Sequence, residues 1–295
     1  MKTLRLIATA ASIVVLICSC KGDELAGLND DGSLCGTFSV SDSTKVVFSR
    51  GNLQYQPSSA TWRFAESQRE TIGSDNENIS ESYTGWIDLF AWGTSGWSSG
   101  ADAYMPYSVV TKDSMYWLGG DSSANMSGTY ANADWGQYNA IENGGNTPGQ
   151  WRTLTKDEWV YLVNQRQGAS QKFGLAKVDN VEGLILLPDS WTLPDGLEFA
   201  PGMEKGYKTN RYNAAKWSKM QAAGAVFLPS AGYREEYTVF TKFKDENGCG
   251  FYWSSTTLSK PNCNILFFGN EAVNPKNFSK RHFGLAVRLV KPTNL

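Results

Sequence analysis

The hydrophobic positions follow helical spacing in two stretches of the chain. Thr155 and Glu158 form a T-x-x-E capping box, and apolar residues then recur at helical spacing until Gly168. A second helix is predicted over residues 212–221, where apolar residues recur until Gly224 ends the pattern. Each apolar stripe is expected to pack against a sheet.

Short apolar runs between turn-forming residues predict strands in the rest of the chain. These runs cover residues 37–40, 45–49, 184–187, 225–228, 251–255, 264–268 and 285–290. The first two flank Ser41-Asp42-Ser43, so we expect them to form a β-hairpin. Two helices among many short strands and long connections indicate the α+β class.

Two further segments show no regular apolar period. Residues 66–82 are polar and rich in Gly, Asp and Asn, so they are expected to form an exposed insertion. Residues 85–150 are dense in Gly, Ser, Asn, Trp and Tyr, which is typical of long loops fixed by aromatic rings. Those rings either form a stacking surface for sugars or fill the core of a domain with little regular structure.

The first residues predict export. Lys2 and Arg5 precede an apolar stretch from Leu6 to Ile17, which is too short to span a bilayer. The stretch ends in Ile17-Cys18-Ser19-Cys20, which resembles a bacterial lipobox. This resemblance implies a signal peptide over residues 1–19 and lipidation of Cys20, whereas an ordinary signal peptide cut nearby is the alternative.

Lys21-Gly22-Asp23-Glu24 resembles the signal that sends lipoproteins of Bacteroidetes-type bacteria to the outer face of the outer membrane. The resemblance implies a lipid-anchored protein facing the cell exterior, and a solvated linker is the alternative. Residues 20–35 lack periodicity and are expected to form a flexible tether. The folded domain is then expected to cover residues 36–291.

The charge balance restricts the class of partner. The chain has 27 basic and 29 acidic residues, a net charge of −2. Nothing in this balance favours binding to nucleic acid or to an anionic membrane. The expected partner is therefore a protein or glycan recognised by shape and polar contacts, with the membrane engaged through the N-terminal lipid.

The cysteines leave two alternatives open. After removal of Cys18 and acylation of Cys20, the remaining cysteines are Cys35, Cys249 and Cys263. A disulfide between Cys249 and Cys263 would close a short loop and stabilise the fold by roughly 3 kcal/mol. Buried free thiols are the alternative.

Three segments carry a family resemblance. They are Trp151 to Trp159 (WRTLTKDEW), Phe227 to Arg234 (FLPSAGYR), and Tyr252 to Thr256 (YWSST) with Arg281 to Val290 closing the chain. In this order they resemble the C-type lectin-like fold. The closest branch is the one shared by formylglycine-generating-enzyme-like domains, Fibrobacter major paralogous domains and the variable proteins of diversity-generating retroelements. The resemblance implies short, twisted, mainly antiparallel strands, two helices, long structured loops, and pairing of the first and last strands.

The same resemblance implies a ligand-binding surface between the Trp-Ser-Ser strand and the terminal strand, here residues 257–283. Periodicity adds an argument within this interval: if Ile265 and Phe267 face the core, Leu266 and Phe268 point outward. A covering loop that buries both faces is the alternative. The predicted ligand-binding residues are Leu258, Ser259, Lys260, Asn262, Asn264, Leu266, Phe268, Asn277, Phe278, Ser279, Lys280, His282 and Phe283.

The sequence offers little support for an enzymatic function. Formylglycine-generating enzymes use two closely spaced cysteines with copper, whereas Cys249 and Cys263 are widely separated. His282 is the only histidine, which disfavours a zinc site, an iron site or a histidine-based catalytic triad. The calcium-binding signatures of C-type lectins are also absent. We therefore expect no catalytic residues, no metal and no cofactor.

The sequence predicts a surface lipoprotein whose C-type lectin-like domain binds a ligand without turning it over. A structural component of a surface appendage and a divergent formylglycine-generating-type oxygenase are the alternatives. The binding surface is a candidate for diversification by a retroelement, although mutagenesis of Asn codons would not produce Lys260, Glu271, Lys276 or Lys280. A neighbouring reverse-transcriptase gene would distinguish a diversifying receptor from a static one.

Overall fold

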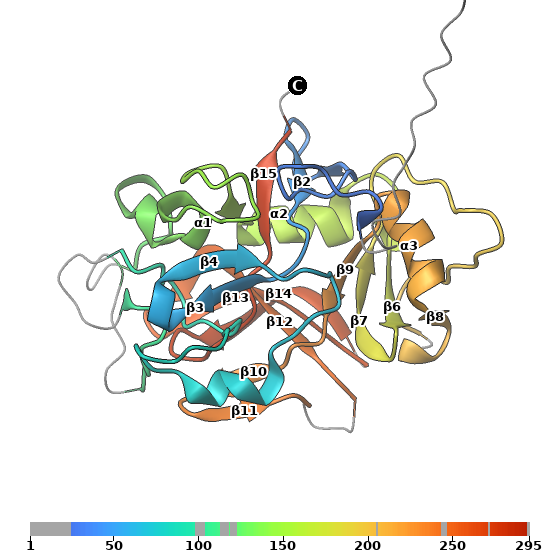
Figure 1. Ribbon diagram of the computed structural model, residues 1–295. Helices are drawn as coiled ribbons and strands as arrows, with labels where there is room; N and C mark the ends of the chain where they lie inside the picture. The colour runs from blue at the N-terminus through green and yellow to red at the C-terminus, as the bar shows by residue number, and fades with distance from the viewer. Residues whose placement is uncertain are drawn as a thin grey trace, which may run out of the picture.

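The protein is an α+β structure of small, mostly antiparallel sheets with a few short helices (Figure 1). The structure is a computed structural model that describes residues 25–97, 104–112, 118, 123–204, 206–242, 247–270 and 272–293. The predicted leader, Cys20 and Glu271 lie outside the described residues. Within them, no helix has the length and apolar character needed to cross a bilayer.

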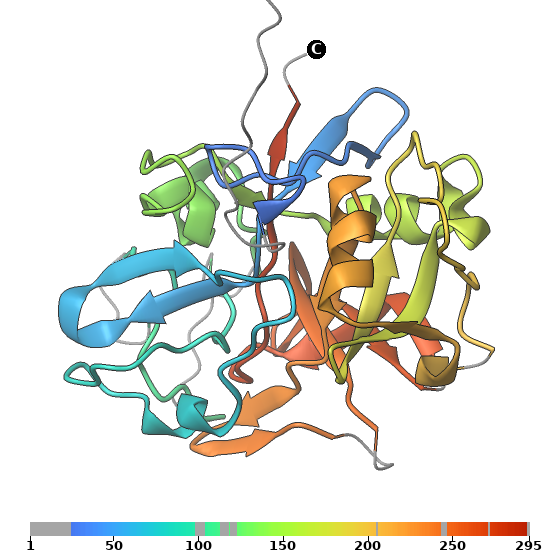
Figure 2. The same cartoon turned by 45° about the vertical axis from the view of Figure 1, so that its right-hand side comes forward.

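One four-stranded sheet joins the two ends of the described chain. Its order is β1 (Phe38–Ser39), β2 (Lys45–Phe48), β15 (Leu289–Pro292) and β5 (Arg152–Thr153). β1 and β2 form the predicted hairpin, and β15 runs antiparallel to β2 with Val290 opposite Phe48. The last strand thus joins the sheet of the first strand, as predicted, but it pairs with β2 rather than with β1 itself. Figures 1 and 2 show β15 beside β2 at the upper end of the molecule.

The other strands form two further sheets and two hairpins. One sheet has the order β12 (Gly250–Ser259), β13 (Asn262–Gly269) and β14 (Ala272–Lys280). The other has the order β8 (Asn210–Tyr212), β6 (Phe173–Val178), β7 (Val181–Leu186) and β9 (Val226–Pro229), with only β8 and β6 parallel. The hairpins are β3 (Leu53–Gln56) with β4 (Thr61–Phe64), and β10 (Tyr233–Glu235) with β11 (Thr238–Phe240).

Both predicted helices form. α2 (Lys156–Val160) begins with the full capping box, because Glu158 N donates to Thr155 Oγ1 and Thr155 N donates to the Glu158 carboxylate. It continues as a π-helical turn, Tyr161–Gln165. α3 (Ala214–Ala222) begins two residues later than expected because the Asn213 side chain accepts from Lys216 N and caps it.

The remaining helical elements are short. α1 spans Trp135–Tyr138. The 3-10 turns are Pro57–Ser59, Gly73–Asn78, Gly128–Ala133, Ala169–Gln171 and Gly206–Lys208.

The aromatic residues of the Trp-rich segment mainly fill the core. Trp92 and Trp135 are fully buried, Trp86 and Trp97 are partly buried, and Trp117 lies outside the described residues. Trp92 donates through its indole N–H to the Ser254 carbonyl oxygen at 2.8 Å. For the described residues, the core interpretation is therefore correct and a sugar-stacking surface is not formed by Trp92 or Trp135.

The predicted tether over residues 20–35 is wrong for its described part. Residues 25–35, which we call the N-terminal segment, pack against the domain: Leu34 is buried in the core, and its N–H donates to the Phe48 carbonyl oxygen at 2.8 Å. Gln221 at the end of α3 donates to the Ala26 carbonyl oxygen. The prediction was wrong because it rested on side-chain composition, whereas backbone groups of this segment form hydrogen bonds with the domain.

The predicted exposed insertion, residues 66–82, is also partly buried. Asn76 is fully buried and exchanges hydrogen bonds with Asp88 through its amide and its carbonyl oxygen. Gln68 accepts from the buried guanidinium of Arg288, which also donates to the Phe227 carbonyl oxygen at 2.7 Å. The segment shows no apolar periodicity because buried polar side chains, such as Asn76 and Gln68, hold it against the core through hydrogen bonds.

Candidate functional site: an aromatic cavity beside β12–β14

An open cavity of about 300 Å³ lies beside the β12–β14 sheet. Six of its ten lining residues are apolar or aromatic, and we call it the aromatic cavity. It is lined by Tyr233, Phe251, Asn262, Phe267, Asn277, Phe278, Ser279, Lys280, Phe283 and Leu285. Cavities of this kind, apolar with a few polar groups, are the usual sites for ligands.

One wall of the cavity is formed by aromatic rings in contact with one another, with Tyr233 of the β10–β11 hairpin at their centre. Tyr233 on β10 lies between two parallel rings, Phe240 at 4.9 Å and Phe283 at 5.5 Å between ring centroids. The edge of Phe251 meets the same tyrosine at 5.3 Å. Because each ring is held by at least one other, this wall is already ordered before any ligand arrives.

β10 itself is held by a buried arginine. Arg234 donates to the Leu89 carbonyl oxygen at 3.2 Å and to the Glu236 carbonyl oxygen at 2.6 Å. Its backbone N–H also donates to the Gly284 carbonyl oxygen at 2.8 Å. These bonds fix the hairpin against the segment that carries Phe283. Burial raises the pKa of Tyr233, with smaller contributions from Glu235 and Cys249, so this phenol stays neutral at physiological pH.

The polar side of the cavity comes from β13 and β14. Asn262, Asn277 and Ser279 contribute amide and hydroxyl groups, and Lys280 contributes an ammonium group 5.6 Å from the Phe283 ring centroid. The side-chain oxygen Oδ1 of Asn277 accepts from Phe278 N at 2.8 Å. Phe278 is 54% exposed and stands at the rim. The cavity thus combines ring faces, hydrogen-bonding groups and one cation.

Six of the thirteen predicted ligand-binding residues meet at this cavity: Asn262, Asn277, Phe278, Ser279, Lys280 and Phe283. Three others, Leu258, Ser259 and Lys260, are exposed around the turn between β12 and β13 but do not line it. Leu258 is 52% exposed, nearly the same fraction as Phe278. The remaining four predictions concern side chains that the structure buries.

Leu266 and Phe268 are not surface residues, which corrects their predicted outward orientation. Both have no exposed area and pack in the main core, where the Phe268 ring lies 5.9 Å from Tyr252. α2 packs against all three strands of this sheet and covers that face. The opposite face holds Ile265, which is buried as well, and Phe267, which is partly buried and lines the cavity. The alternative of a strand buried on both faces is correct over most of β13.

Asn264 and His282 are also buried, which corrects their prediction as ligand contacts. Asn264 is 4% exposed, and its carbonyl oxygen accepts from the Ser254 hydroxyl at 2.7 Å. His282 is 3% exposed and meets Phe283 edge-on, with 4.9 Å between ring centroids. Burial lowers the pKa of His282, with a further contribution from Lys280. His282 therefore supports Phe283 from behind the cavity wall.

Four lining residues were absent from the predicted set: Tyr233, Phe251, Phe267 and Leu285. Tyr233 belongs to the segment FLPSAGYR, which pointed to the family but not to a contact with residues 277–283. A partial signal existed for Phe251 and Phe267, because they are cross-strand neighbours with rings 5.0 Å apart. The contact between β10 and residue 283 depends on tertiary folding, and no local pattern encodes it.

The proposed disulfide does not form. Cys35, Cys249 and Cys263 are thiols that form no disulfide, and the last two are buried. Cys249 precedes Gly250, which pairs with Phe268, whereas Cys263 pairs with Thr257 toward the other end of β13. Phe268 is five positions after Cys263 along β13, a span of about 17 Å, well beyond the reach of a disulfide. The same separation prevents both thiols from binding one copper ion, as the oxygenase alternative would require.

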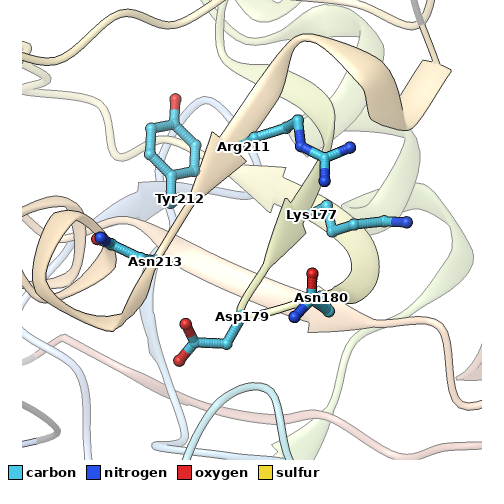
Figure 3. A pocket seen from close by; sticks show the side chains of 6 residues that line it. All are labelled: Lys177, Asp179, Asn180, Arg211, Tyr212 and Asn213. Atoms are coloured by element: carbon cyan, nitrogen blue, oxygen red, sulfur yellow. The ribbon is translucent and has the colours of Figure 1, made fainter.

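A second, polar cavity of about 180 Å³ lies at the β6–β7 turn (Figure 3). Lys177 and Arg211 extend to the same side of the sheet, but Lys177 pairs with Glu182 at 3.0 Å. Asp179 pairs with Arg69 at 3.4 Å, and the Tyr212 hydroxyl donates to the Glu198 carbonyl oxygen. Most of these polar groups already bond to other residues of the fold, around the β6–β7 hairpin and the start of α3. The aromatic cavity is therefore the stronger candidate for ligand binding.

Comparison with known protein families, with curated proteins and with solved structures found no match. In the described part of the chain, no group of three or more His, Cys, Asp or Glu side chains is arranged to hold a metal ion.

Proposed function

We propose that this chain is a lipid-anchored surface protein whose domain binds a protein or glycan ligand in the aromatic cavity. The domain is proposed to be of the C-type lectin-like type. Pairing of β15 with β2 and the long excursion between them support this proposal. The observation that carries the binding function is the convergence of six predicted contact residues on one open cavity.

The chemistry of the lining supports binding rather than turnover. Ring faces can stack on the apolar face of a sugar or receive an aromatic or aliphatic side chain, while Asn262, Asn277 and Lys280 fix the orientation through hydrogen bonds. The ten lining residues include no carboxylate and no imidazole, so they offer no general base of the usual kind. Such a surface holds a ligand and releases it unchanged.

Assembly by strand addition is the weaker alternative. β14 is an edge strand, since its sheet has the order β12-β13-β14. Pro275 lacks an N–H, and the N–H groups of Lys276 and Phe278 donate to the Asn274 and Asn277 side chains. These features, with two lysines, are typical of edges that resist pairing with another strand.

Two variants, one at the cavity rim and one outside the cavity, test the binding function. The full chain, solubilised in detergent, would be screened against a glycan array and a displayed peptide library. We expect Phe278→Ala to weaken binding of the selected ligands about tenfold, because a half-exposed ring at the rim is removed. Leu258→Ala is the matched control, since Leu258 has the same exposure and lies outside the cavity.

Binding that is equally strong in both variants would place the ligand elsewhere. Loss in Leu258→Ala alone would indicate a site at the β12–β13 turn instead of the cavity. Capture of one fixed partner by both variants would favour the assembly alternative.

A further inference from the structure

The N-terminal segment, residues 25–35, fixes where the chain enters the domain. Leu28 bridges to Leu34, Ser33 bridges to Ser49, which directly follows β2, and Arg50 N donates to the Gly32 carbonyl oxygen at 2.9 Å. Asp31 forms an ion pair with Lys291 on β15. The segment is thus tied to both the opening hairpin and the last strand.

The spacer between the proposed lipid and this fixed point is short. Leu25 is five positions after Cys20, and a fully extended chain spans at most about 18 Å over that distance. A domain of about 270 residues has a radius of gyration near 18 Å, which corresponds to a diameter of about 48 Å. A tether about one third of the domain diameter does not let the domain turn over on the bilayer.

The segment and the aromatic cavity lie toward opposite ends of the molecule. In Figures 1 and 2 the start of the described chain, the β1–β2 hairpin and β15 occupy the upper half. The β10–β11 hairpin, which supplies Tyr233 to the cavity wall, lies at the lower end in both views. An anchor at the first end therefore directs the second end away from the membrane.

The surface near the N-terminal segment suits a headgroup layer. Asp30, Asp42 and Lys45 are exposed there, and a cavity of about 580 Å³ is lined by Asn29, Asp31, Ser33, Gln150 and Lys291 among others. Charges of both signs favour contact with zwitterionic headgroups and oppose insertion into hydrocarbon. We call this surface, formed by residues 25–34, 41–45 and 291–293, the proximal face.

We propose that the proximal face rests against the lipid headgroups and that the aromatic cavity is held outward, several tens of ångströms from the bilayer. This inference rests on the lipid anchor of the proposed function. It specifies the orientation of the site: a ligand reaches the cavity from the medium or from another cell, not from the membrane to which the protein is attached.

Energy transfer to the membrane tests the orientation. The acylated full chain would be reconstituted in vesicles of phosphatidylethanolamine and phosphatidylglycerol that contain a headgroup acceptor dye. Cys35→Ser removes the exposed native thiol, and a donor dye is attached through Asp30→Cys or Tyr237→Cys, both at exposed positions. We expect severalfold greater transfer from position 30 than from position 237.

A lengthened spacer is the matched control. An insert of about 30 Gly and Ser residues after Glu24 has a root-mean-square span of about 30 Å and should make transfer from the two positions similar. Equal transfer from both positions with the native spacer would overturn the orientation while leaving the anchor intact. If Cys20→Ala floats with vesicles as well as the native chain does, the lipid anchor itself fails, and the orientation fails with it.

Discussion

Two neighbouring residues of β13 lie in opposite surroundings. Phe268 has no exposed area and packs with Tyr252 in the main core, whereas Phe267 lines an open cavity. Their side chains point to opposite faces of the sheet, as the period of two requires. The difference between them comes from what covers each face: α2 packs over one, while β10 and Phe283 stand beside the other and leave a space.

Leu258 and Phe278 show a similar contrast, although both were predicted from the sequence to contact the ligand. Leu258 and Phe278 are exposed to nearly the same extent, but only Phe278 lies at the cavity rim. Exposure alone therefore does not identify a binding residue in this protein. A concave surface made by several elements does.

The largest expected effect is loss of stability at the covered face of β13. Phe268→Ala should lower the free energy of unfolding by about 3–5 kcal/mol and Leu266→Ala by about 2–5 kcal/mol, because each change leaves a core cavity. Urea unfolding followed by tryptophan fluorescence measures both. A cost below about 1 kcal/mol would mean that these side chains are exposed, as the period of two first suggested.

A smaller effect is expected from two buried carboxyls. Burial raises the pKa of Asp88 and of Asp134 to about 6, above the usual value near 3.9. The folded chain then holds these protons more tightly than the unfolded chain, so each carboxyl favours folding most below about pH 4 and loses this contribution as the pH rises through 6. Between pH 7.5 and pH 5, each should add about 1 kcal/mol to the free energy of unfolding.

Asp134→Asn isolates this contribution. His282 acts in the opposite direction, since its pKa is lowered by burial and its stabilising effect is lost as the pH falls. The stability gain from pH 7.5 to pH 5 should therefore be about 1 kcal/mol smaller in the variant than in the native chain. The same gain in both proteins would show that Asp134 keeps an ordinary pKa.

The smallest expected effect concerns the thiols. Cys263 lies on the covered part of β13 with its pKa raised to about 12 by burial, whereas Cys35 is exposed. A thiol reagent should modify Cys35 in the folded chain and reach Cys249 and Cys263 only after unfolding. A reductant should leave the urea midpoint unchanged, since no disulfide is present to lose. A drop equivalent to about 3 kcal/mol would instead reveal a bond across that loop.

Local signals in the sequence were sufficient for both main helices and for about half of the strands, whereas β3, β4, β5, β6, β8, β10, β11 and β14 were not predicted. The capping box at Thr155 and the prolines after residues 187 and 228 mark element ends through their own backbone chemistry. Buried polar contacts gave no comparable signal in the sequence. Asn76 and Gln68 are of residue types common in loops, yet both are buried and form hydrogen bonds with residues distant in the chain. Periodicity reports only apolar burial, so such segments were predicted to be exposed.

The candidate site was predictable only in part. The interval 257–283 included one side of the cavity, because β13 and β14 are consecutive in the chain. The opposite wall comes from Tyr233, whose distance from Phe283 depends on how β10 packs. Choosing between Phe267 and Phe268 required knowledge of the cover on each face, which the alternation of residues along a strand does not contain.

Filling the cavity tests the central claim most directly. Ser279→Trp places an indole on a cavity wall, while Ser259→Trp adds the same ring at the exposed β12–β13 turn outside it. Dissociation constants for a selected ligand would be measured alongside the free energy of unfolding. We predict that Ser279→Trp abolishes binding, that Ser259→Trp preserves it, and that both variants remain folded. Unchanged affinity in a folded Ser279→Trp protein would contradict the claim that the aromatic cavity holds the ligand.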